Sequence, residues 1–134
     1  IDFGFVGDIQ KVNSQISLDL VDKNYLPIVS PLAVTNDGVI VNINADTIAI
    51  ALAKSLQTEK LILFTNTDGI YDEQRKLIST LNLSEAEKLI DNEVVKDGML
   101  VKVHNCIDAV SNGIKSVHII SGISSHSLLK EIFT

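Results

Sequence analysis

Two short stretches of this sequence carry the residue types that phosphoryl transfer requires. Residues 41–46 (Val-Asn-Ile-Asn-Ala-Asp) place two amides and a carboxylate where an expected strand turns into a helix. Residues 97–102 (Asp-Gly-Met-Leu-Val-Lys) place a glycine at an expected helix start and a lysine one turn inside it. Amides can hold a polar substrate, and a helix N-terminus with a cation can hold phosphate. The two stretches therefore predict a site that moves a phosphoryl group.

The same residues also have structural interpretations. Asp46 in the first turn of a helix favours the macrodipole, which alone would explain it. Lys102 on a helix can be a solvated charge, and Asn42 and Asn44 can be capping and turn residues. Composition and spacing leave both interpretations open.

Length and composition favour one aliphatic α/β domain. The chain of 134 residues is 46% hydrophobic and only 4% aromatic, so its core must be built from Ile, Leu, Val and Ala. That mixture suits a sheet covered by helices better than a β-sandwich. The length corresponds to a single domain or fragment over residues 1–134. Because the chain begins at Ile1 without an initiator Met, we expect it to be a piece of a longer protein.

Charge and cysteine content exclude several classes of partner. A formal net charge of −6 with scattered lysines makes nucleic acid and anionic membranes poor partners. No apolar run approaches the ~18 residues of a membrane helix, and the N-terminus does not resemble a signal peptide. Cys106 is the single cysteine, so a disulfide framework is excluded. A soluble, cytoplasmic protein is expected.

Strands and helices are predicted to alternate along the chain after an irregular segment over residues 1–12. Helices are expected over residues 13–22 (with Asn13 as N-cap), 45–56, 84–91 (opened by a Ser84/Glu87 capping box), 100–111 (ended by Gly113) and 125–133. The helix over residues 45–56 is apolar on nearly every side, which predicts burial. Strands are expected over residues 25–30, 60–65, 77–80 and 116–120, with a hairpin over 33–41 around Asn36-Asp37-Gly38.

This alternation predicts a three-layer α/β/α sandwich with a mainly parallel sheet. Ligands on such sheets bind beyond the carboxyl ends of the strands. The loops at Ser30-Pro31, residues 65–69 and Ser121-Gly122 leave those ends, and the helix starts near Asp46 and Gly98 are candidates for the same edge.

Other common chemistries lack their motifs. The sequence contains no Walker loop and no Gly-x-Gly-x-x-Gly fingerprint. His104, His118 and His126 lack metal-ligand spacing, so no metal site is predicted. Ser125-His126-Ser127 has no nucleophile-elbow context, and capping of the last helix is the favoured role. Cys106 is interpreted as a small buried hydrophobe.

Five motifs, taken in order, resemble the N-acetylglutamate kinases of the amino-acid kinase family. Residues 41–46 are similar to the family's Asn-x-Asn-x-Asp signature, and residues 98–102 match its Gly-Met-x-x-Lys helix start. Residues 61–72 resemble its nucleotide-side strand and loop, although Asn66 stands where the family commonly has Asp. Residues 116–122 and 128–134 resemble its last strand and helix. The resemblance covers essentially the whole chain and implies the family's fold.

The resemblance also implies roles for particular residues. Asn42, with Asn44, would bind the N-acylglutamate substrate, and Asp46 would orient the cationic groups around the transferring phosphoryl. Lys102 would neutralise charge as the γ-phosphoryl leaves ATP. The nucleotide pocket would be lined by Thr65, Asn66, Thr67, Gly69, Gly98 and Met99. Mg²⁺ would bridge phosphate oxygens and need few protein ligands, and the complete protein would be a homo-oligomer.

The family's glycine-rich phosphate loops, a first catalytic lysine and a substrate-binding arginine have no counterpart in this sequence. The chain is therefore expected to be the nucleotide-binding C-terminal portion of an enzyme that phosphorylates N-acetyl-L-glutamate in arginine biosynthesis. Another amino-acid kinase, such as a glutamate 5-kinase or an aspartate kinase, is one alternative. A non-catalytic nucleotide-binding or regulatory module is the other.

Overall fold

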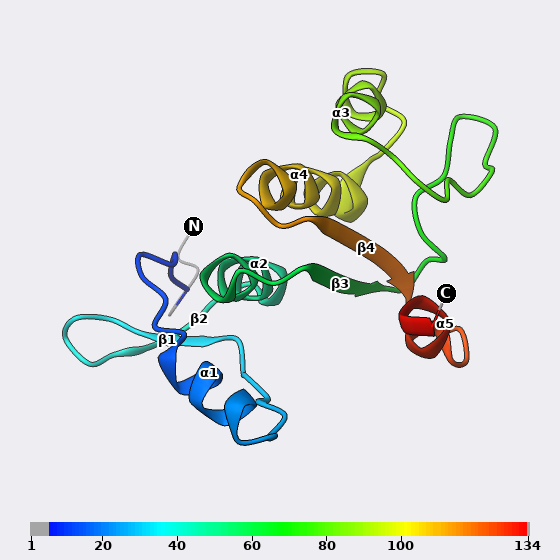
Figure 1. The fold of residues 1–134 in the computed structure, drawn as a ribbon. Coiled ribbons are helices and arrows are strands. Elements are labelled where there is room, and N and C mark those ends of the chain that lie inside the picture. The colour runs from blue at the N-terminus through cyan, green and yellow to red at the C-terminus, as the bar shows by residue number, and fades with distance from the viewer. Residues whose placement is uncertain (1–5, 134) are drawn as a thin grey trace. The chain divides into compact units, whose positions relative to one another are not determined.

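The structure is a computed structural model that describes residues 6–133. It forms two compact units, residues 1–58 and residues 59–134. Figure 1 shows the order of the elements along the chain.

The first unit contains α1 (Gln15–Asp22), β1 (Leu32–Val34), β2 (Ile40–Asn42) and α2 (Ala45–Leu56). β1 and β2 pair antiparallel, with Ala33 opposite Val41. Gly38 closes the turn between them at a φ of +83°, a conformation that glycine adopts without strain. The hairpin predicted from Asn36-Asp37-Gly38 is therefore confirmed.

Helix α2 follows the hairpin within two residues and matches its predicted bounds. Asn44 caps it, because the Asn44 side chain accepts a hydrogen bond from the backbone N–H of Thr47 at 3.2 Å. Asp46 lies in the first turn, where a carboxylate favours the helix dipole. Only Ile50 and Ala53 of this helix are buried, so the expected burial on nearly every side is only partly met.

Two expectations for the first unit are wrong. Residues 25–30 form no strand, and Leu26 and Ile28 are 86% and 92% exposed. A strand needs a hydrogen-bonding partner as well as apolar side chains, and no described segment pairs with these residues. The N-cap of α1 is Ser14 rather than Asn13, although the Asn13 side chain does accept the N–H of Gln15.

The second unit is built on a parallel pair of strands. β3 (Lys60–Thr65) and β4 (Ser116–Ser121) pair in parallel from Lys60 opposite Ser116 to Thr65 opposite Ser121. The chain between them forms α3 (Leu83–Asp91) and α4 (Asp97–Ser111), and α5 (Ser127–Phe133) follows β4. α4 and α5 both contact β4, and α3 contacts α4. The α/β class and parallel pairing are therefore confirmed.

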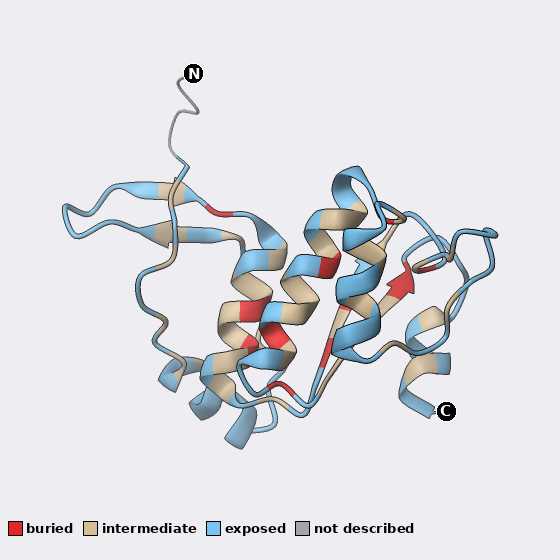
Figure 2. Ribbon diagram, turned by 90° about the horizontal axis from the view of Figure 1, so that it is seen from above, coloured by how far each residue is buried: buried red, intermediate tan, exposed pale blue. Residues whose placement is uncertain are grey.

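The buried apolar side chains of the second unit are all aliphatic, as composition predicted. Most of them lie on the two strands and on α4, and two lie in the segments on either side of α4 (Figure 2). They are Leu61, Leu63, Val95, Val103, Ala109, Ile114 and Ile120. Gly113 follows α4 at a φ of +100° and donates its N–H to the carbonyl of Val110, so its predicted helix-ending role is confirmed.

Several predicted boundaries of the second unit need correction. Residues 77–80 form no strand, and Leu77 makes only a single bridge with Tyr71. The capping box of α3 joins Asn82 to Glu85 rather than Ser84 to Glu87, because asparagine caps as well as serine and stands two residues earlier. α4 begins three residues earlier than expected, and α5 two residues later.

The segment before α1 is irregular over its described part, as expected. Val6 bridges Asn42, and a side chain at Gly7 would lie 3.0 Å from Val41. The prediction for residues 1–5 lies outside the described residues. Over residues 6–133, every helix is too short or too polar to cross a membrane.

Candidate active site

The first unit carries the candidate residues for substrate. Asn42 ends β2 with an exposed side chain, and its carbonyl accepts the N–H of Gly7 at 3.2 Å. Asn44 uses its side-chain oxygen to cap α2, which leaves its amide NH₂ as the group that could serve a ligand. Asp46 is half-buried in the first turn of the same helix. The hairpin and helix start therefore hold all three at one strand-to-helix junction.

The second unit carries the predicted nucleotide loop at the carboxyl end of β3. Thr65 ends the strand and is the register partner of Ser121 at the end of β4. The pairing continues one residue further, since the Gly122 N–H donates to the Thr65 carbonyl at 2.7 Å. The loops that follow β3 and β4 thus leave the same edge of the sheet, where ligands of parallel sheets bind.

Gly69 fixes the shape of that loop. It is buried, and its φ of +150° lies in a region that residues with a side chain rarely adopt. A Cβ at this position would lie 3.0 Å from Leu77 Cδ1. The Thr67 hydroxyl donates to the Gly69 carbonyl at 3.3 Å, while Asn66 is exposed. The loop can therefore present polar groups on a defined backbone.

The helix start predicted from Gly98 also lies toward this edge. α4 runs back alongside β4, so its first turn points to the carboxyl ends of β3 and β4 (Figure 1). Its N-cap, Lys96, makes no side-chain capping bond, and a Cβ at Gly98 would have no described neighbour within 4 Å. Met99 and Lys102 are half-buried on the first two turns. An open helix N-terminus with a lysine one turn inside suits an anion.

Sequence patterns assigned no role to Asp68 or to Ser124. Asp68 accepts hydrogen bonds from the hydroxyls of Tyr71, at 3.3 Å, and Ser124, at 3.4 Å. Ser121 is buried, and its hydroxyl accepts the backbone N–H groups of Ile123 and Ser124. The position of Asp68 within the predicted loop was the one sequence feature that could have indicated a role for it. No sequence pattern indicated its contact with Ser124, 56 residues away.

Cavity volume alone does not mark the predicted site. A cavity of about 740 Å³ is lined by α4, β4 and residues 78–84, and none of the predicted site residues lines it. Cys106, half-buried, lies on its wall. A cavity of about 420 Å³ lies beside the predicted nucleotide loop and is lined in part by Asp68, Gly69 and Ser124. The polar loops and the open start of α4, rather than the larger cavity, mark the candidate site.

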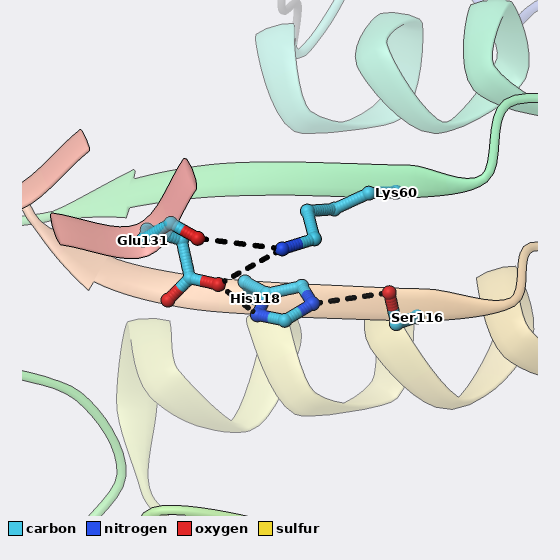
Figure 3. A network of polar contacts seen from close by, with 4 residues as sticks. All are labelled: Lys60, Ser116, His118 and Glu131. Atoms are coloured by element: carbon cyan, nitrogen blue, oxygen red, sulfur yellow. Dashed lines mark hydrogen bonds and ion pairs between the residues drawn. The ribbon is translucent and has the colours of Figure 1, made fainter. Parts of the chain in front are cut away.

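A polar network ties α5 to both strands. Glu131 Oε1 lies 2.6 Å from His118 Nδ1 and 3.2 Å from Lys60 Nζ, and His118 Nε2 lies 3.0 Å from the Ser116 hydroxyl (Figure 3). Both ring nitrogens of His118 therefore have partners, which gives this residue a structural role in β4.

At the opposite end of these strands, Lys115 lies 2.6 Å from Glu59. The hydrogen bond and the charge of Lys115 lower the pKa of Glu59. Among the described residues, no three His, Cys, Asp or Glu side chains are grouped so as to hold a metal ion.

The sequence profile of the amino acid kinase family matches residues 1–121. The chain belongs to the amino acid kinase family. The parallel strands and the helices of this chain, with the polar loops at the strand ends, belong to the fold of that family.

The curated relatives of this chain bear the name of the proteins that its motifs resemble. An acetylglutamate kinase from Methanosphaera stadtmanae is 42% identical over 100% of this chain and 46% of its own length. One from Kosmotoga olearia is 44% identical over 99% of this chain and 47% of its own. The chain thus spans about half the length of the curated relatives it matches.

A solved structure shares the fold across the whole chain. The N-acetylglutamate synthase from Neisseria gonorrhoeae, complexed with coenzyme A and L-arginine, superposes with a TM-score of 0.92. It is 29% identical, and the match covers 100% of this chain and 31% of the synthase. The fold of this chain therefore also occurs in a protein named a synthase rather than a kinase.

Proposed function

We propose that this chain is part of an ATP-dependent acetylglutamate kinase of arginine biosynthesis. The enzyme would phosphorylate the γ-carboxylate of N-acetyl-L-glutamate to give N-acetyl-L-glutamyl 5-phosphate. The observation that carries the proposal is 42–44% identity to proteins of that name over at least 99% of the chain. A cytoplasmic homo-oligomer is part of the same proposal.

The proposed reaction is an in-line transfer. A γ-carboxylate oxygen of the substrate forms a bond to the γ-phosphorus of ATP as the bond to the ADP oxygen breaks. Such transfers need no covalent enzyme intermediate, so the protein contributes positioning and charge neutralisation. Mg²⁺ would enter with the nucleotide on its phosphate oxygens and neutralise part of their charge.

Each predicted residue has a role in this proposal. Asn42 and the amide of Asn44 would donate hydrogen bonds to acylglutamate, and Asp46 would orient cationic groups. Lys102 and the open N-terminus of α4 would neutralise charge on the nucleotide. The loop after β3, with Thr65, Asn66, Thr67 and Gly69, would line the nucleotide pocket together with Gly98 and Met99. The geometry within each unit supports these assignments.

The direct test is turnover by the complete polypeptide that carries this sequence. ADP release should depend on N-acetyl-L-glutamate, and hydroxylamine should trap the acyl phosphate as a hydroxamate. Glutamate and aspartate as acceptors test glutamate 5-kinase and aspartate kinase activity. ADP release with either of these, and none with N-acetyl-L-glutamate, would overturn the proposal.

A second candidate comes from the N. gonorrhoeae synthase, because its match in fold covers the whole chain. In that case the chain would be a nucleotide-binding or regulatory domain within a protein of another activity. The lower identity, 29% against 42–44%, favours the kinase. Thiol release from acetyl-CoA in the presence of glutamate, without N-acetylglutamate-dependent ADP release, would favour the synthase.

A further inference from the structure

Hydrogen bonds beyond the paired strands join the loops that follow β3 and β4. Thr65 and Ser121 are register partners, and the Gly122 N–H bonds the Thr65 carbonyl at 2.7 Å. Beyond that bond, the Ser124 hydroxyl donates to Asp68 Oδ1 at 3.4 Å. Asp68 lies between Thr67 and Gly69, and neither Asp68 nor Ser124 has a role in the function proposed above.

The carboxylate of Asp68 holds its own loop as well. Its second oxygen, Oδ2, accepts the hydroxyl of Tyr71 at 3.3 Å. The two oxygens of one side chain thus have different partners, one within the β3 loop and one in the β4 loop. A carboxylate has acceptor sites for both and makes stronger hydrogen bonds than a neutral amide would.

Ser124 is a fixed partner because its own loop is anchored. Its backbone N–H donates to the buried Ser121 hydroxyl at 3.2 Å. The Ser127 hydroxyl, at the start of α5, donates to the Ser121 carbonyl at 2.6 Å. Further along α5, Glu131 contacts Lys60 and His118 on the two strands (Figure 3). The β4–α5 segment is therefore tied to the sheet at both ends.

We propose that Asp68 is a positioning residue, held by Ser124 and Tyr71, that keeps residues 66–69 in their nucleotide-binding conformation. The inference rests on the proposed function in that it takes this loop to bind nucleotide. It goes beyond that function because it makes the segment after β4 a determinant of nucleotide affinity. Asp68 itself need not touch the nucleotide, since its action passes through the backbone of Thr67 and Gly69.

The experiment measures nucleotide affinity in the complete polypeptide. The Kd for Mg-AMP-PNP is determined calorimetrically for the unaltered protein and for Asp68→Ala, Ser124→Ala and the double variant. Losing the hydrogen bond from Ser124 predicts a Kd raised about 2- to 5-fold for Ser124→Ala, and losing both bonds predicts a larger rise for Asp68→Ala. In the double variant, Ser124→Ala should add nothing to Asp68→Ala.

Matched variants separate positioning from general damage. Ser125→Ala removes a neighbouring exposed hydroxyl and should leave the Kd unchanged. The KM for N-acetyl-L-glutamate should stay within about twofold in Ser124→Ala, whereas a general loss of structure would alter both KM values. An unchanged Kd in Asp68→Ala, or equal effects of Ser124→Ala and Ser125→Ala, would overturn the proposal.

Hydrogen exchange distinguishes failure of this inference from failure of the proposed function. In the protein without nucleotide, amides of residues 66–69 should exchange faster in Asp68→Ala than in the unaltered protein. If the unaltered protein binds no Mg-AMP-PNP, the nucleotide site itself is wrong and this inference falls with it. If it binds normally and exchange is unchanged in Asp68→Ala, only the positioning role is wrong.

Discussion

His118 Nδ1 lies 2.6 Å from Glu131 Oε1, which joins the middle of β4 to the last helix of the chain (Figure 3). The same carboxylate oxygen lies 3.2 Å from Lys60 Nζ on β3. These side chains are one-quarter to two-fifths exposed, so water screens the pairs in part. Every described residue of α5 is at least partly exposed, and we infer that these polar contacts contribute much of its attachment.

Glu131→Gln should loosen α5 without unfolding the rest of the second unit. A neutral amide keeps the shape of the side chain but loses the charge that attracts the ammonium group of Lys60. The expected loss of stability is about 0.5–1.5 kcal/mol. Hydrogen exchange of the α5 amides, compared with Glu87→Gln on α3 as a control, measures it. Equal exchange in the two variants would contradict the prediction.

Lys102→Ala should lower kcat in the complete polypeptide by ~10²-fold or more, because it removes a cation from the developing phosphate charge. Steady-state kinetics with N-acetyl-L-glutamate and ATP measure the effect. Lys88→Ala, which changes an exposed lysine of α3, is the control and should leave kcat unaltered. A folded Lys102→Ala variant with normal kcat would return Lys102 to a purely structural role.

Asn42→Ala should mainly raise the KM for N-acetyl-L-glutamate and spare the KM for ATP. The substitution removes a substrate hydrogen bond worth ~1–3 kcal/mol, which corresponds to a KM raised about 5- to 150-fold. Varying each substrate in turn separates the two constants. An effect confined to ATP would place Asn42 on the nucleotide side instead.

Asp46→Asn should chiefly depress kcat and leave both KM values nearly unchanged. The amide keeps the size of the side chain but leaves the catalytic cations without the charge that orients them. Its place in the first turn of α2 also predicts a small loss of helix stability, which thermal unfolding measures separately. Normal kcat with lowered stability would leave Asp46 with the helix dipole alone.

The 134-residue chain by itself should not turn over, because it lacks the glycine-rich loops and the arginine that the family resemblance implies. Weak Mg-ATP binding should persist. The chain should also self-associate, since Leu26 and Ile28 are 86% and 92% exposed. An ADP-release assay and sedimentation velocity test these points. Robust acetylglutamate-dependent turnover, or a monomer at high concentration, would contradict them.

Much of the fold follows from local sequence signals. The turn at Asn36-Asp37-Gly38 and the bounds of α2 were predicted from residue types a few positions apart. β3 was predicted at its observed bounds, because a short apolar run between polar segments suits a buried strand. The candidate site residues were likewise named from short motifs, whose spacing is itself a sequence property.

Other features depended on contacts that local patterns do not encode. Residues 25–30 have strand-like composition but pair with no described segment, because a strand exists only with a partner. Asn82 and Ser84 are both residue types that cap helices, and only the backbone conformation shows that Asn82 is the N-cap of α3.

The sequence by itself determined which side chains are available for phosphoryl transfer and on which local elements they lie. Only the tertiary structure placed Thr65 opposite Ser121 and brought the Ser124 hydroxyl to the carboxylate of Asp68, 56 residues away. The physical reason is that strand register and loop contacts depend on how the whole unit packs. Several serines of the sequence could have contacted that carboxylate, and the parallel pairing of β3 with β4 places Ser124 beside it.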